Sequence, residues 1–189
     1  MNPFYSTFPE TVTVNGEKYR INTDFRDFLF MSDVLESNAS DIRKAKAVLS
    51  MYKDKIPKDY SAAMMAIADF ITEAKTPKDG QEDEEQESRK KLISYEKDAP
   101  FIIGDFLRFY DIDLISCKYL HWKKFQLLLT GLPEDAETKK RIAYRDIDTG
   151  KIKDKDERAR IIRIQKKIAI ESMEADEERI GELFGEMMW

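Results

Sequence analysis

The residues best suited to covalent chemistry are the only cysteine and the only histidine of the chain, Cys117 and His121. They lie four positions apart in a segment with helical apolar spacing, residues 117–130, so a helix would place both side chains on one face. A thiol and an imidazole act as nucleophile and base only when a third group orients the base within a cleft. The sequence indicates neither, so structural packing is favoured over catalysis.

Metal chemistry has equally little support. Asp111 and Asp113 could offer oxygens to Mg²⁺ or Ca²⁺, but a binding loop needs more oxygen ligands at regular spacing and a glycine for its tight turn. Capping of the following segment by Asp113 is the better interpretation. One cysteine and one histidine also leave too few ligands for a Cys/His zinc cluster. We therefore expect no metal, no cofactor and no enzymatic activity.

A basic stretch could in principle bind phosphates. Residues 139–167 hold twelve Lys and Arg side chains against five acids. Isoleucines recur through the helix predicted for residues 154–170, which favours a half-buried helix with a solvated or protein-facing basic side. The whole chain carries a net charge of −5, and its aromatic residues follow helical spacing rather than alternating with basic residues on strands. We expect no nucleic-acid binding.

Length and composition set the scale of the fold. The 189 residues, of which 42% are hydrophobic, suit one medium domain or two small ones with a genuine core. No apolar run approaches the roughly 18–20 residues of a membrane span, and the first eight residues do not resemble a signal peptide. The single cysteine excludes an internal disulfide framework. These features predict an intracellular protein that is not bound to a membrane.

The clearest element is a β-hairpin at residues 11–21, where Asn15 and Gly16 separate two alternating runs and suit the positive φ angles of a tight turn. A lone hairpin needs an apolar surface to lie on. Three aromatic residues ahead of it belong to no periodic element, and we interpret them as an arm that packs on the body or on a neighbour. They are Phe4, Tyr5 and Phe8.

Apolar residues at helical spacing predict helices in the rest of the chain. Thr23 and Ser40 are expected to cap the first two, and Asp59 or Ser61 the third. The expected helices cover residues 25–35, 42–52, 64–71, 95–110, 117–130, 135–145 and 154–170. The sequence therefore predicts a mainly α fold, a helical domain with a short N-terminal β-hairpin.

Composition divides the chain into four parts. Residues 1–75 form the arm, the hairpin and three helices, and residues 76–94 form an acidic flexible linker. Residues 95–170 form a C-terminal helical core, and residues 171–189 an acidic amphipathic tail. The centre of the core is expected at Phe106, Tyr119, Trp122, Phe125 and Leu129.

The tail carries an apolar stripe at steps of three, one, three and one, which makes a single helical face. Its residues are Ile180, Leu183, Phe184, Met187 and Met188. Methionine adapts to irregular surfaces, so this stripe could bind a partner, or the tail could fold back on the basic helix.

Several segments, taken in order, resemble one bacteriophage family. They are residues 110–114 (YDIDL), 119–133 (YLHWKKFQLLLTGLP) and 151–158 (KIKDKDER), preceded by the hairpin leading into residues 22–26 (NTDFR). This pattern is similar to the gene-product-fifteen family of Gram-positive siphophages over most of residues 11–169. The resemblance is weak between residues 57 and 94. The family is usually encoded in the tail morphogenesis region near the tape-measure gene, and it has no established catalytic residues.

The resemblance implies a tail assembly chaperone in the host cell cytoplasm. Its expected partner is the phage tape-measure protein, with the tail-tube protein as a second partner to consider, and a homo-oligomer is left open. The tail stripe and the aromatic arm are the candidate partner-binding residues. The alternative is a structural virion component of the tail or connector, and a small enzyme is a minor third interpretation.

Overall fold

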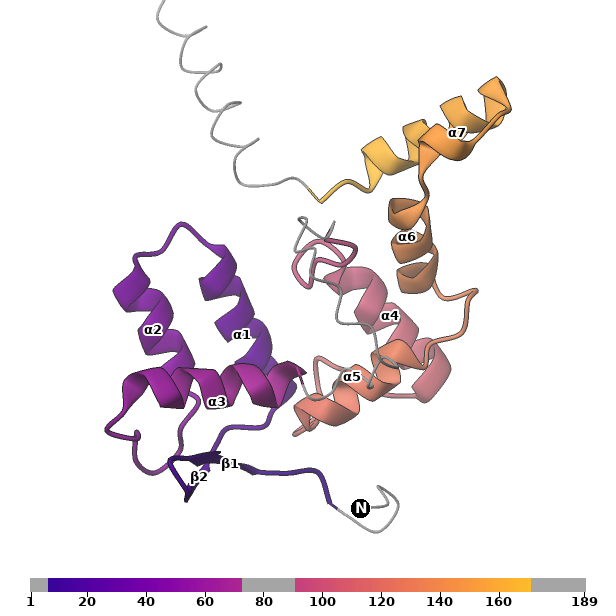
Figure 1. The fold of residues 1–189 in the computed structure, drawn as a ribbon. Coiled ribbons are helices and arrows are strands. Elements are labelled where there is room, and N and C mark those ends of the chain that lie inside the picture. Colours follow the sequence, from indigo (N-terminus) through magenta and orange to yellow (C-terminus); the bar gives the residue numbers. More distant parts are fainter. Residues whose placement is uncertain (1–6, 73–90, 171–189) are drawn as a thin grey trace, which may run out of the picture. The chain divides into compact units, whose positions relative to one another are not determined.

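The computed structural model describes residues 7–72 and 91–170 of the chain. Within them the chain forms one two-stranded antiparallel sheet and seven α-helices, which confirms the mainly α fold with an N-terminal hairpin (Figure 1). The described residues divide into two compact units, residues 7–72 with 111–131 and residues 91–110 with 132–170. The tail and most of the predicted linker lie outside the described residues.

The hairpin pairs β1 (Thr11–Val14) with β2 (Glu17–Arg20). Asn15 and Gly16 form the turn with φ angles of 49° and 83°, as the Asn-Gly pair predicts. Val12 and Val14 are buried on one face of the hairpin, and Thr11 and Thr13 are exposed on the other.

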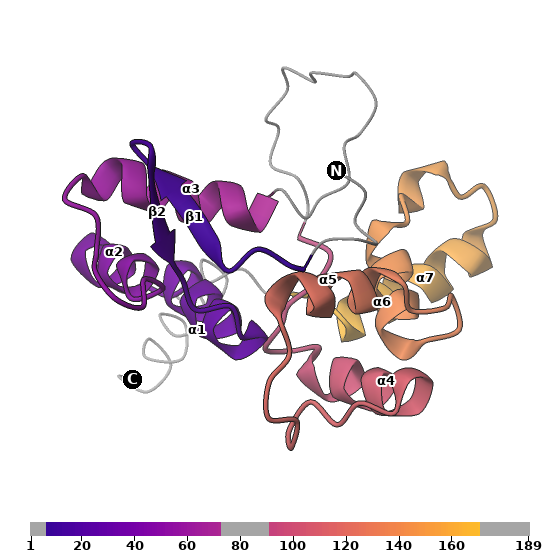
Figure 2. The ribbon, with the colours of Figure 1, turned by 90° about the horizontal axis from the view of Figure 1, so that it is seen from below.

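Three helices complete the N-terminal part of the first unit: α1 (Phe25–Glu36), α2 (Asp41–Leu49) and α3 (Tyr60–Thr72). α3 lies between the hairpin and the pair formed by α1 and α2 (Figure 1), and the strands cross over it in Figure 2. The buried side chains of α3 supply the apolar surface that the hairpin requires. They are Ala63, Ile67 and Phe70.

The helix caps differ in part from the expected ones. Asp24 caps α1, because its Oδ1 accepts a hydrogen bond from the Arg26 amide over 3.0 Å. Thr23 is buried instead, and its hydroxyl is hydrogen-bonded to the Tyr119 hydroxyl over 2.8 Å. Ser40 precedes α2 without a side-chain capping bond. Asp59 caps α3, as predicted, by accepting a hydrogen bond from the Ala62 amide over 3.0 Å.

The first unit is completed by α5 (Trp122–Thr130), which begins five residues later than the helix expected from Cys117. The prediction was wrong because the backbone before α5 is paired with a distant segment. The Phe25 amide donates to the Leu120 carbonyl over 2.9 Å, and the Trp122 amide donates to the Thr23 carbonyl over 2.7 Å. These bonds hold residues 120–122 extended, so the helix cannot begin earlier.

The second unit contains α4 (Ala99–Tyr110), α6 (Glu137–Asp146), the short 3₁₀ helix η2 (Thr149–Lys151) and α7 (Lys155–Lys167). Asp105 of α4 caps α6 from outside, since its carboxylate accepts hydrogen bonds from the Glu137 and Thr138 amides over 3.2 and 2.8 Å. Asp154 caps α7 by accepting from the Glu157 amide over 2.7 Å.

The single hydrophobic centre expected around five residues is divided between the units. Phe106 is buried in the second unit, whereas Trp122 and Phe125 are buried in the first. Tyr119 is 53% exposed, and Leu129 is half-buried. The expectation of one centre was therefore wrong, because residues 111–131 belong to the first unit.

Candidate functional site

His121 serves a structural purpose that uses both ring nitrogens. It is the N-cap of α5, where Nδ1 accepts a hydrogen bond from the Lys123 amide over 3.1 Å. Nε2 therefore carries the proton and donates a hydrogen bond to the Pro9 carbonyl over 3.1 Å. Burial lowers the pKa of His121 below its usual range, although the Pro9 carbonyl and Glu10 act in the opposite direction. The structure thus favours a neutral imidazole.

Cys117 lies in the irregular segment before α5, so the predicted arrangement of both residues on one helix was wrong. Its sulfur lies 3.2 Å from Nη2 of Arg26 and donates to the Leu114 carbonyl over 3.7 Å. Arg26 also donates to the carbonyls of Cys117 and Leu114. The cysteine is therefore part of a loop that Arg26 holds in place.

Asp113 behaves as a local cap, as predicted. Its Oδ1 accepts from the Ile115 amide over 2.9 Å, and its Oδ2 accepts from the Ser116 hydroxyl over 2.6 Å. The bond from Ser116 is the main reason that the pKa of Asp113 lies below its usual range. Among residues 7–72 and 91–170, no group of three or more His, Cys, Asp or Glu side chains could hold a metal ion.

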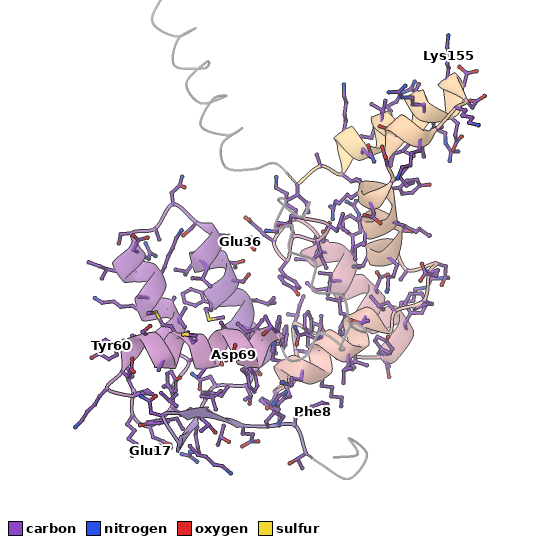
Figure 3. The ribbon with its side chains drawn as sticks, viewed as in Figure 1. Phe8, Glu17, Glu36, Tyr60, Asp69 and Lys155 are labelled. Carbon is purple, nitrogen blue, oxygen red and sulfur yellow. The ribbon has the colours of Figure 1, made fainter. Side chains whose placement is uncertain are left out.

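The aromatic arm is described only from residue 7 onward, so Phe4 and Tyr5 lie outside the described residues. Phe8 stacks on the His121 ring with the centroids 5.0 Å apart, and it remains 38% exposed. Together with the Pro9 bond, this contact fixes the start of the described chain on the first unit. Phe8 is labelled in Figure 3.

The basic helix α7 buries one side and exposes the other. Ile161 is buried, and Gln165 donates to the Tyr144 and Ile147 carbonyls over 2.9 and 2.8 Å, which fastens α7 to α6. The cationic side chains face solvent, as Lys155 does at the start of the helix (Figure 3). The exposed cations of α7 are Lys155, Arg158, Arg160, Arg163, Lys166 and Lys167.

Large apolar side chains are exposed on several described elements. Those with more than half of their surface exposed are Phe30, Ile42, Tyr60, Met65, Leu107, Ile115, Tyr119 and Leu127. Singly exposed apolar residues are common on protein surfaces and do not define a site by themselves. The tail stripe from Ile180 to Met188 lies outside the described residues, so its role in partner binding stays a prediction.

Sequence reasoning missed the way in which His121 and Arg26 fasten distant segments to the first unit. The N-cap role of His121 had no clear signal either, because the helical spacing covers residues 117–130 and histidine is not one of the residue types preferred at N-caps. The contacts to Pro9 and Cys117 had no local signal. No helix in the described part of the chain has the length and apolar character needed to cross a membrane.

Comparison with known protein families gives a match over most of the chain. The family model described as Bacteriophage Gp15 protein matches residues 4–170. No curated protein and no solved structure matches the chain. Because the family model covers most of the sequence, this protein belongs to the Bacteriophage Gp15 family.

Proposed function

We propose that this protein is a tail assembly chaperone that binds the phage tape-measure protein in the host cell cytoplasm. The observation that carries the proposal is the family match over residues 4–170, since this family suggests a protein of the phage virion or of its morphogenesis. The tail-tube protein is a second candidate partner. Within this proposal the protein acts by binding and carries out no catalytic step.

Three features of the described residues support binding rather than catalysis. His121 uses Nδ1 to cap α5 and Nε2 to hold Pro9, so a proton-transfer role would break one of these contacts. Cys117 is held by Arg26 in a separate contact. Meanwhile, several large apolar side chains of the first unit face solvent, where they are available to a protein partner.

Co-expression with the tape-measure protein tests the proposal. A chaperone should increase the soluble fraction of the tape-measure protein and co-purify with it, because it covers apolar surface that otherwise drives aggregation. An unrelated acidic protein of similar size, expressed from the same vector, is the control. Equal solubility with both proteins would contradict the proposal.

Mass spectrometry of purified virions separates the chaperone from a structural component of the tail or connector. A chaperone should be absent from the mature particle, whereas a structural component should be present in a defined copy number. Detection of stoichiometric amounts in virions would replace the proposed function by the structural one.

The tail stripe is tested by deleting residues 173–189. We expect the variant to keep the thermal unfolding of the full chain and to lose capture of the tape-measure protein in co-expression. If capture is unchanged, the stripe is not the binding surface. If the deletion unfolds the protein, the tail belongs to the core, and Phe8 with its arm becomes the next candidate surface.

A further inference from the structure

The outer edge of β1 has no partner strand within residues 7–72 and 91–170. The Ile21 amide donates to the Glu10 carbonyl over 3.0 Å, which makes residues 10 and 21 a hydrogen-bonded pair. Antiparallel pairs alternate, so Val12 and Val14 also bond to β2, whereas the backbone groups of Thr11 and Thr13 point away from it. Among the described residues, no partner is shown for these four backbone groups.

The opposite edge of the hairpin, along β2, has backbone hydrogen bonds to another segment of the chain. Beside β2, the Lys53 amide donates to the Arg20 carbonyl over 3.0 Å, and the Asn22 amide donates to the Met51 carbonyl over 2.7 Å. This edge is therefore partly covered by residues 51–53. On the β1 edge the amides and carbonyls of both Thr11 and Thr13 can accept an incoming strand, and the two side chains are exposed.

A groove of about 240 Å³ runs along this open edge. β1 forms one wall and α3 forms the other, so the groove has room beside the backbone for a side chain. Its lining residues are Pro9, Thr11, Val12, Thr13, Ala66, Asp69 and Phe70. A strand added at the edge would direct alternate side chains to the face on which Val12 lies, toward α3.

Asp69 is the one charged residue in this lining. It lies on α3, is exposed, and has no ion-pair partner among the described residues. Its position is labelled in Figure 3. The groove thus combines an open backbone edge with a carboxylate, which matches an extended segment that carries a lysine or arginine.

We propose that the β1 edge and its groove bind an extended segment of the client protein by strand addition, with a cationic side chain of that segment beside Asp69. This inference rests on the proposed function for the identity of the client, while the edge and the groove belong to this chain alone. Pairing would use up to four backbone hydrogen bonds, at Thr11 and Thr13. Main-chain bonds give affinity, and the groove selects one side chain.

Two proline variants, one on each strand of the hairpin, test strand addition at the β1 edge. Thr13 lies opposite Lys18 in the hairpin, and neither residue bonds to the other strand. Thr13→Pro removes a donor from the open edge, whereas Lys18→Pro removes a donor from the other edge at the same level of the hairpin. Circular dichroism first establishes that both variants fold like the unaltered chain.

The probe is the blocked pentapeptide Thr-Val-Lys-Val-Thr, titrated into ¹⁵N-labelled protein. We expect chemical-shift changes at Thr11, Thr13, Ala66 and Asp69, and slower hydrogen exchange of the Thr11 and Thr13 amides. Lys18→Pro should bind like the unaltered chain, and Thr13→Pro should lose most of the binding. Equal binding by the two proline variants would overturn strand addition.

A charge exchange tests the role of Asp69. A peptide with Glu in place of Lys should bind about two- to fivefold more weakly at low salt, as expected for an exposed ion pair. Asp69→Lys should reverse this preference, and a cation is tolerated there because the site lies near the C-terminus of α3. An unchanged preference would remove Asp69 from the site.

Protein without peptide provides the remaining control. If its Thr11 and Thr13 amides are already protected and dilution removes the protection, a second copy occupies the edge. Protection at every dilution would mean that a segment of the same chain occupies it, and either result overturns the proposal. If the peptide does not bind but the tape-measure protein is still kept soluble, the inference fails and the proposed function stands.

Discussion

Arg145 and Asp98 form a buried two-point ion pair at the centre of the second unit. Nη1 of Arg145 lies 2.6 Å from Oδ2 of Asp98, and Nη2 lies 2.8 Å from Oδ1. Arg145 also donates to the carbonyls of Leu92 and Ile168, each over 2.8 Å. One side chain therefore joins the start of the described second unit, the turn before α4 and the end of α7.

Replacing Arg145 by methionine should destabilise the second unit strongly. Asp98 is only 1% exposed, so the variant would leave a buried carboxylate without its main partner. The loss of one partner of a buried pair costs about 3–5 kcal/mol. Urea denaturation followed by circular dichroism measures the change in the free energy of unfolding.

Two variants sharpen this test. Arg160→Met removes an exposed arginine of α7 that lies 3.7 Å from Glu157, and its effect should stay within about 0.5 kcal/mol. The double variant Asp98→Leu with Arg145→Met should recover part of the stability, because the buried charge is removed as well. If Arg145→Met is no more destabilised than Arg160→Met, the pair does not hold the unit together.

His121 should make the stability depend on pH below about 6.5. Burial lowers its pKa in the folded protein, so below about pH 6.5 the unfolded chain binds a proton that the folded chain does not. The stabilisation is thus fully present above about pH 6.5 and is lost as the pH falls through the folded pKa. Thermal unfolding at several pH values should show this decline.

The control is His121→Asn, which keeps an acceptor for the Lys123 amide but cannot titrate. Since the chain has one histidine, this variant should show a weaker decline in melting temperature over the same pH range. Titration of the imidazole by NMR gives its pKa directly. A value at or above about 6.5 would contradict the predicted direction.

The parts of the fold that the sequence predicted are those with a local cause. The Asn15-Gly16 turn requires positive φ angles that these residue types adopt readily, and the structure has them. Asp59, one of the two residues expected to cap α3, does so through the Ala62 amide three residues away. In both cases a few neighbouring residues determine the backbone geometry, so the local sequence is sufficient to predict it.

The start of α5 and the division into units depend on distant contacts instead. Residues 120–122 are held extended by backbone bonds to Thr23 and Phe25, about a hundred positions earlier in the chain. The same is true of Asp105, which caps α6 from another helix. The helix expected over residues 117–130 begins too early for this reason, because helical spacing alone does not fix where a helix begins.

Two glycine substitutions should change the free energy of unfolding in opposite directions. Gly16 has a φ of 83°, so Gly16→Ala should destabilise the hairpin by about 1 kcal/mol. Gly104 lies inside α4, where an added methyl group meets no atom within 4 Å. Gly104→Ala should therefore stabilise by about 0.4–1 kcal/mol. The midpoints of urea denaturation measure both changes in stability. If both variants are stabilised or both are destabilised, the backbone conformation of the glycine does not decide the effect.

Trp122 is the residue whose truncation should most damage the first unit. It is 4% exposed and stacks on Phe28 and Phe125 with ring centroids 5.0 and 5.6 Å apart. Trp122→Ala leaves a cavity between these rings and should cost about 3–5 kcal/mol, a large part of the stability of a small domain. Urea denaturation followed by circular dichroism should show the loss.

Leu127→Ala is the matched control for Trp122→Ala, because Leu127 lies on the same helix and is 59% exposed. Its truncation should change the free energy of unfolding by no more than about 0.5 kcal/mol. Trp122→Phe should fall between the two variants, since a smaller ring keeps part of the stacking. If Trp122→Ala unfolds at the same urea concentration as Leu127→Ala, the stack of Phe28, Trp122 and Phe125 is not what stabilises the first unit.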